Sequence, residues 1–180
     1  GSADDRALAI AADSTGRVYI GGETISTNFP TPAGYDGSAN GAYDGFVARL
    51  SVGGATLEYA SYIGGTLNDG VYGVAVDNNY AAYVTGYTNS ANFPTVGAYD
   101  PTHNFGYDVF VAKFSSTGAT LDYSTDLGGT RTEWANAIAL DASKNIYITG
   151  LTTSNLFPVS NAFDASFNSL YDAFVTKIAA

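Results

Sequence analysis

Three polar residues, Asp, Asn and Asp, recur with fixed spacing near the end of a long loop and could bind a metal ion. Hard cations such as Ca²⁺ take about six to eight oxygen ligands from carboxylates, amides and carbonyls. The loop lacks the dense Asp-x-Asp-x-Asp-Gly run of a known Ca²⁺ loop, so hydrogen bonds that order the loop are the alternative explanation. No cofactor other than Ca²⁺ is expected. The candidate metal ligands are Asp36, Asn40, Asp44, Asp100, Asn104, Asp108, Asp164, Asn168 and Asp172.

Aromatic residues of the same loop could bind a sugar. Most repeated aromatics should pack in the core, but tyrosines in a loop keep a hydroxyl that can face a ligand. Trp134 is the only tryptophan and replaces Arg6 and Gly70 of the other copies. An isolated surface aromatic is the alternative for this residue. The candidate ligand-binding residues are Tyr35, Tyr43, Tyr99, Tyr107, Tyr171 and Trp134.

The sequence contains no recognisable catalytic motif. His103 is the only histidine, and the sequence supplies it with no evident partners for a metal site or a Ser-His-Asp triad. No motif singles out a pair of carboxylates of the kind that glycoside hydrolases use. The Gly64-Gly65 and Gly128-Gly129 pairs precede an expected strand rather than a helix, so they do not predict a phosphate site. We therefore expect a protein that is not an enzyme and has no catalytic residues.

Composition excludes several classes of function. The net charge of −10 disfavours nucleic acid and anionic membranes as partners. With 46% hydrophobic and 13% charged residues, the chain has the material for a packed core. The absence of cysteine excludes disulfides and thiolate metal sites. Because the chain also lacks methionine, we interpret it as a processed or excised piece, with residues 1–2 as a cloning remnant.

An internal repeat determines the expected architecture. Phe-Pro recurs every 64 residues, at Phe29-Pro30, Phe93-Pro94 and Phe157-Pro158, and an Asp-x-Phe-Val segment keeps the same step. The expected units are residues 3–66, 67–130 and 131–180, the last without the counterpart of the fourth segment of the others.

Each complete repeat contains four strand-like runs. In the second repeat these are residues 72–77, 83–87, 108–114 and 120–127. Small residues in the first run suit a crowded innermost strand, and the fourth run looks outermost, with one buried and one solvated side. The sequence therefore predicts an all-β fold of four-stranded antiparallel β-propeller blades, three in tandem with the third incomplete. A solenoid or an array of β-sandwiches is the alternative.

Several motifs in order resemble a known family. Residues 138–141, 147–158, 171–177 and 121–129 carry Ile-Ala-x-Asp, Tyr-Ile-x-Gly-x-Thr-x-Ser-x-x-Phe-Pro, Tyr-Asp-x-Phe-Val-x-Lys and Leu-x-Tyr-Ser-x-x-Leu-Gly-Gly. Together they resemble the bacterial SBBP β-propeller repeats. The resemblance implies an extracellular or cell-surface protein with no established enzymatic activity. Residues 78–81 depart from the usual turn, and Gly21-Gly22 replaces Thr-Gly, which we expect to weaken that strand slightly.

Three blades do not close a ring, because complete propellers have about four to eight. We expect exposed flanks, an open edge at residues 173–178, and either a larger ring or self-association of two copies. The leading function is a scaffold or adhesion module that binds a protein or glycan at a cell surface. The alternatives are a lectin-like propeller that uses the loop tyrosines and, third, a propeller glycoside hydrolase.

Overall fold

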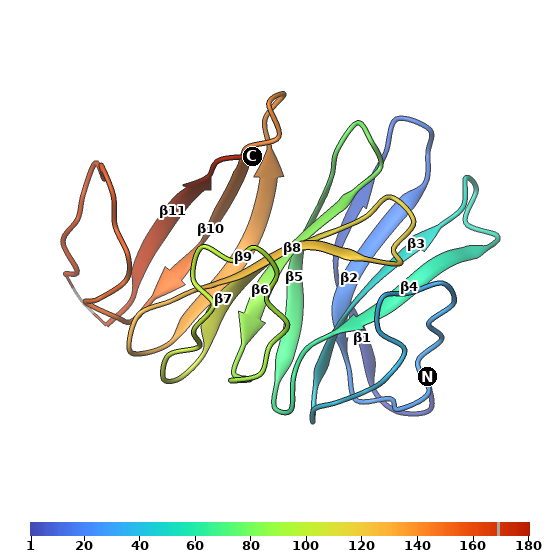
Figure 1. Cartoon of the computed structure of the whole chain (residues 1–180), viewed down its shortest axis with the longest axis horizontal. Helices are drawn as coiled ribbons and strands as arrows, with labels where there is room; N and C mark the ends of the chain where they lie inside the picture. The colour runs from blue at the N-terminus through green and yellow to red at the C-terminus, as the bar shows by residue number, and fades with distance from the viewer. Residues whose placement is uncertain (169) are drawn as a thin grey trace.

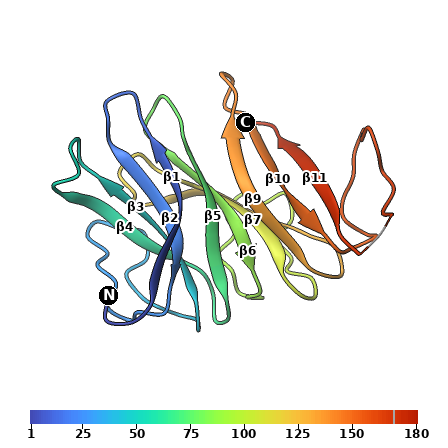
Figure 2. The same cartoon turned by 180° about the vertical axis from the view of Figure 1, so that it is seen from behind.

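The computed structural model describes every residue of the chain except Ser169. Three antiparallel sheets, of four, four and three strands, form blades 1, 2 and 3. The sheets stand side by side as an open arc in sequence order (Figures 1 and 2). The strands are β1 (Asp5–Ala12), β2 (Val18–Thr24), β3 (Asp44–Leu50), β4 (Leu57–Ile63), β5 (Asp69–Val76), β6 (Ala82–Thr88), β7 (Asp108–Phe114), β8 (Leu121–Leu127), β9 (Glu133–Leu140), β10 (Ile146–Thr152) and β11 (Asp172–Ile178).

The predicted fold class is confirmed. Each blade runs outward in chain order, and the innermost strands β1, β5 and β9 lie next to one another. Among the residues that the structure describes, the third blade has three strands, of which β11 is the last. No α-helix is found among the described residues, so none of them forms a membrane-spanning helix.

Every innermost strand contains a β-bulge. The alternation of side chains in the sequence did not predict these bulges. In blade 2 the register shifts between Val71 and Gly73, opposite Gly86 of β6. The expected strand began at Tyr72, whereas β5 begins at Asp69, because pairing continues on the other side of the bulge. A bulge locally increases twist and redirects side chains. Here it places Tyr72 on an exposed part of the molecule's surface.

Packing between blades forms two hydrophobic cores. One joins blades 1 and 2 around Tyr19, Val71 and Phe110, and the other joins blades 2 and 3 around Val111 and Ile148. Large side chains in repeated layers fill the space between twisted sheets.

The extra glycine of β2 belongs to the interface between blades 1 and 2. A Cβ on Gly21 would lie 2.3 Å from Val71 Cγ1 and 2.7 Å from Val74 Cγ2. Gly21 therefore makes room for the neighbouring blade. The expectation that it merely weakens the strand missed this packing role.

The long loop of each repeat is packed onto its own blade. The phenylalanine of each Phe-Pro motif stacks on the third strand, with ring centroids 4.5 Å apart for Phe29–Phe46 and 4.6 Å apart for Phe93–Phe110. The loop backbone then pairs with the outer edge of the fourth strand: in blade 2, Val96 and Ser124 exchange hydrogen bonds of 3.0 and 2.9 Å. The fourth strand is the outermost strand of its sheet, as the sequence suggested, and the long loop covers its outer edge.

Candidate functional site

A hollow rimmed by aromatic side chains lies where the three blades meet. Tyr87 is at its centre, with ring centroids 5.5 Å from Tyr72, 5.4 Å from Tyr107 and 6.2 Å from Trp134. The hollow has a volume of about 310 Å³, at the small end for ligand sites. Its lining residues are Arg6, Glu23, Tyr43, Asn68, Tyr72, Tyr87, Tyr107 and Trp134.

One ion pair fixes the polar side of this aromatic hollow. Arg6 Nη1 donates to Glu23 Oε1 at 2.9 Å, and Tyr87 donates its hydroxyl to Glu23 Oε2 at 2.9 Å. The Arg6 guanidinium also lies over the Tyr43 ring, 5.8 Å from its centroid. Flat ring faces beside fixed hydrogen-bonding groups can bind a ligand with both apolar and hydroxyl surfaces.

The structure brings together half of the predicted ligand-binding residues. Tyr43, Tyr107 and Trp134 line the aromatic hollow. Tyr35 instead packs its ring edge against Phe114, while Tyr99 lines a different pocket. The sixth residue, Tyr171, is exposed just before β11.

Sequence reasoning missed five residues of the hollow, namely Arg6, Glu23, Asn68, Tyr72 and Tyr87. The available signal was a departure from the repeat. Tyr87 replaces Glu23 and Leu151, and Tyr72 replaces Leu8 and Asn136, at the same step of 64 residues.

The predicted metal ligands of the long loops mainly hold the loops in shape. In blade 1, Asp44 Oδ2 accepts the backbone N–H of Asn40 at 3.1 Å, and Asp36 Oδ2 accepts the Asn40 side-chain amide at 3.0 Å. Asp108 and Asp172 accept the equivalent backbone N–H of Asn104 and Asn168, each at 2.7 Å. Asp100 and Asp164 each accept a backbone N–H two residues on, both at 2.9 Å.

Other repeated acids stabilise turns and the connections between blades. Asp13 Oδ1 accepts the N–H of Thr15 at 2.8 Å, as expected for an Asx turn, and Asp77 and Asp141 do the same in their blades. Asp69 Oδ2 accepts the N–H of Gly65 at 2.8 Å where blade 1 leads into blade 2. The high acidic content therefore largely reflects hydrogen bonds that the blades need.

His103 is the clearest correction to the sequence analysis, which found no partners for it. Its Nδ1 lies 3.3 Å from Asp108 Oδ2, and Asp126 is close enough that one ligand atom from each residue lies within 4.8 Å of the others. Burial raises the pKa of Asp126 to about 7 and that of Asp108 to about 6.

These raised pKa values predict that the stability of the metal-free chain depends on pH. A chelator in the buffer keeps the chain free of metal ions during the measurement. The folded state binds the Asp126 proton more tightly than the unfolded state does. The contribution of this proton to the free energy of unfolding is therefore fully present below pH ~4 and is lost as pH rises to ~7. In thermal melts from pH 4 to 8, the stability of Asp126→Asn relative to that of the wild type should increase as pH rises, by on the order of 2–4 kcal/mol. A constant difference across this range would contradict the assignment.

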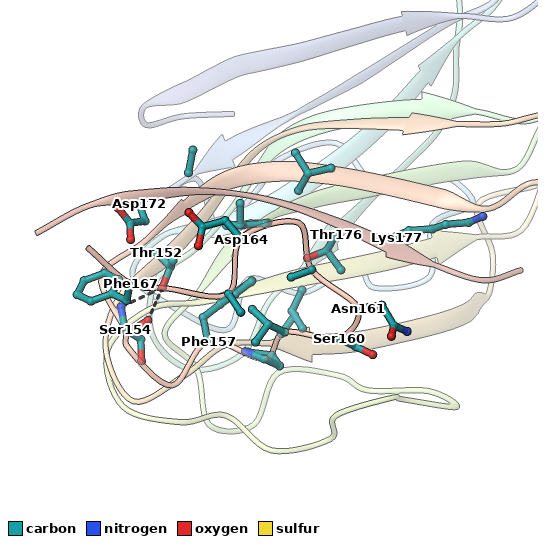
Figure 3. Close-up of a pocket in the computed structure, with 18 of the residues that line it drawn as sticks. Thr152, Ser154, Phe157, Ser160, Asn161, Asp164, Phe167, Asp172, Thr176 and Lys177 are labelled. Atoms are coloured by element: carbon teal, nitrogen blue, oxygen red, sulfur yellow. Dashed lines mark hydrogen bonds between the residues drawn. The ribbon is translucent and has the colours of Figure 1, made fainter. Parts of the chain in front are cut away.

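A second pocket occupies the place of a fourth strand in blade 3. It has a volume of about 700 Å³ and is bounded by β11, by the long loop that precedes it and by Thr125, Asp126 and Leu127 of the neighbouring blade. Figure 3 shows Ser160 and Asn161 of the loop, together with Thr176 and Lys177 of β11, around this pocket. We call it the strand slot.

The other blades show what fills the equivalent space. In blade 2, β8 pairs with β7 on one side, and on the other side Ser124 and Asp126 donate to the carbonyls of Val96 and Asp100, at 2.9 and 3.0 Å. The counterparts of Val96 and Asp100 are Ser160 and Asp164, whose carbonyls accept no backbone hydrogen bond from the described residues. The strand slot therefore presents pairing groups along both sides.

These features define an open arc of β-propeller blades with an aromatic hollow at the meeting point of its sheets. The family model for the SBBP β-propeller repeat matches residues 1–30, 58–94 and 122–158. The chain belongs to this family, and the resemblance expected from its motifs is confirmed. A search of curated proteins gave no match.

Proposed function

We propose that this propeller-repeat scaffold is a non-enzymatic interaction and adhesion module, extracellular or at the cell surface, that binds protein partners by accepting a β-strand. The observation that supports the proposal is the strand slot. Its two sides offer β11 and the loop backbone, and exposed edges of this kind bind extended peptides by main-chain hydrogen bonds. The partner we propose is a fourth-strand segment of another SBBP repeat, including one from a second copy of this chain.

Apolar flanks support self-association as well. Ile10 is exposed on β1 at one end of the arc, and Val175 is exposed on β11 at the other. In blade 2 the equivalent side chains Val74 and Val111 are buried between sheets. The ends of the arc thus resemble unfilled interfaces between blades.

A peptide tests the strand slot. Residues 120–129, Thr-Leu-Asp-Tyr-Ser-Thr-Asp-Leu-Gly-Gly, form the fourth strand of blade 2, so a labelled copy should bind the chain saturably at one site in fluorescence anisotropy. The control peptide carries Ser124→Pro, which removes the N–H that would reach the Ser160 carbonyl. Light scattering should show that the first peptide also reduces self-association. Absence of binding, or equal binding of both peptides, would overturn the proposal.

The aromatic hollow favours a second candidate function, binding of a glycan. Tyr107 and Trp134 meet edge to face with centroids 6.0 Å apart, beside the ion pair of Arg6 with Glu23. On a glycan array, we expect Trp134→Ala and Tyr107→Ala each to reduce binding by at least tenfold, equivalent to about 1.4 kcal/mol. The matched control is Tyr99→Ala, because Tyr99 is exposed and lies outside the hollow. A wild-type chain that binds no glycan, or loss on Tyr99→Ala alone, would reject this function.

A further inference from the structure

Blade 2 contains a buried group of three side chains, one of which also lines the strand slot. His103 comes from the long loop, Asp108 is the first residue of β7, and Asp126 lies in β8. The His103 side chain is 8% exposed and that of Asp108 is fully buried, while Asp126 as a residue is 1% exposed. The fold thus places two carboxylates and an imidazole together away from solvent.

Several polar atoms of this group lack hydrogen-bond partners. Among the described residues, none donates a hydrogen bond to Oδ1 of Asp108, to Oδ1 of Asp126 or to Nδ1 of His103. A buried polar atom without a partner costs roughly 1–3 kcal/mol, and more when it is charged. One ligand atom of each residue lies within 4.8 Å of the others, and a bound ion is one explanation for buried polar atoms without partners.

Blade 1 shows that the fold itself does not require this arrangement. Ala39 stands at the position of His103, and Tyr62 stands at the position of Asp126. The Tyr62 hydroxyl donates to the Ser26 carbonyl at 2.5 Å and accepts the N–H of Phe29 at 3.0 Å. In blade 1 the same place in the fold is therefore filled by a side chain whose hydrogen bonds are satisfied, whereas blade 2 replaces it with an unpaired carboxylate.

The geometry suits a metal ion. Two ligands bound tetrahedrally to Zn²⁺ at about 2.0–2.1 Å lie about 3.3 Å from each other. The observed distance between His103 Nδ1 and Asp108 Oδ2 is 3.3 Å. A divalent ion would also balance the charge of the two buried carboxylates. Asp126 belongs to the lining of the strand slot, which gives the ion a route from solvent.

We propose that His103, Asp108 and Asp126 bind a divalent first-row transition metal ion, with water completing the coordination. An imidazole nitrogen beside two carboxylates suits Zn²⁺ and its neighbours, whereas Ca²⁺ and Mg²⁺ favour oxygen-only sites. This site differs from the Ca²⁺ loop expected from the sequence, because it uses His103 and Asp126 instead of Asp100 and Asn104.

Titration of the chelator-treated chain with ZnCl₂ tests the proposal. Calorimetry should show one ion per chain, and Co²⁺ should give the visible absorption of a tetrahedral or five-coordinate site. His103→Ala and Asp126→Asn should each weaken Zn²⁺ binding at least about 100-fold, because each removes one of three protein ligands. His103→Ala introduces the residue that blade 1 already carries, so it should leave the fold intact.

The control variant is Asp100→Asn, which changes a neighbouring loop acid outside the proposed set and should leave Zn²⁺ binding unchanged. Because His103 is the only histidine, its imidazole NMR signals report directly on coordination. These signals should shift with one equivalent of Zn²⁺. The proposal is overturned if the wild type binds neither Zn²⁺ nor Co²⁺, if His103→Ala binds Zn²⁺ as tightly as the wild type, or if Asp100→Asn abolishes binding.

Discussion

Replacing Gly86 by alanine is expected to destabilise the fold by at least about 3 kcal/mol, since the added atom meets backbone that cannot move aside. A Cβ on Gly86 would lie 1.9 Å from the Gly70 carbonyl oxygen and 3.1 Å from the Tyr72 nitrogen. Those atoms belong to the bulge of β5, which packs against blades 1 and 3. Relief of the clash would require the bulge, and with it the central blade, to shift.

The same close approach of a glycine to the innermost strand occurs in all three blades. We therefore expect an alanine to be destabilising at each of these glycines. The Cβ of an alanine at Gly22 or Gly150 would also lie 1.9 Å from a carbonyl oxygen of the innermost strand. Chemical denaturation monitored by circular dichroism would measure the loss of stability for Gly86→Ala. The matched control is Gly37→Ala, because Gly37 is exposed and a Cβ there would meet only Thr31 Oγ1 at 3.5 Å. Equal stability of the two variants would contradict the steric explanation.

Residues that repeat made the blade predictable from sequence. Phe29 and Phe93 make the same packing contact, each within its own blade. Their fixed spacing therefore indicates a local interaction that can be predicted without knowing how the blades are arranged. Asp13 behaves in the same way, because it accepts hydrogen bonds from Thr15 and Arg17 of its own turn and from Tyr19 of the strand that follows. Such features can be detected from the repeat, because each blade needs the same contact at the same position.

Candidate sites were harder to predict because they form between elements whose residues do not repeat. Trp134 reaches Tyr87 across the interface between blades 2 and 3, and its counterparts Arg6 and Gly70 are different residues. His103 reaches Asp126 only because the loop pairs with the outer edge of β8. The spacing of residues in the sequence does not show that the loop pairs with the outer edge of β8. Comparison of the three repeats does identify the positions at which blade 2 differs from the others.

Replacing Phe110 by alanine is the second large effect that we expect. Phe110 is fully buried in β7, stacks on Phe93 with centroids 4.6 Å apart, and belongs to the core that joins blades 1 and 2. Truncation of a buried phenylalanine costs about 3–5 kcal/mol, because apolar area is lost and a cavity remains. The loop that carries His103 and the backbone of the second Phe-Pro motif should also loosen, which hydrogen exchange at residues 93–104 would detect.

Two phenylalanines serve as matched controls for this core effect. Phe174 makes the equivalent stack with Phe157 at 4.6 Å but lies in a blade that has no fourth strand, and it is 7% exposed. Its truncation should therefore cost less than that of Phe110, since the surrounding structure is free to relax into the strand slot. Phe105 is 82% exposed, so Phe105→Ala should stay within about 0.5 kcal/mol of the wild type. Denaturant midpoints that place Phe174→Ala below Phe110→Ala in stability would show that the third blade, rather than the junction of blades 1 and 2, holds the arc together.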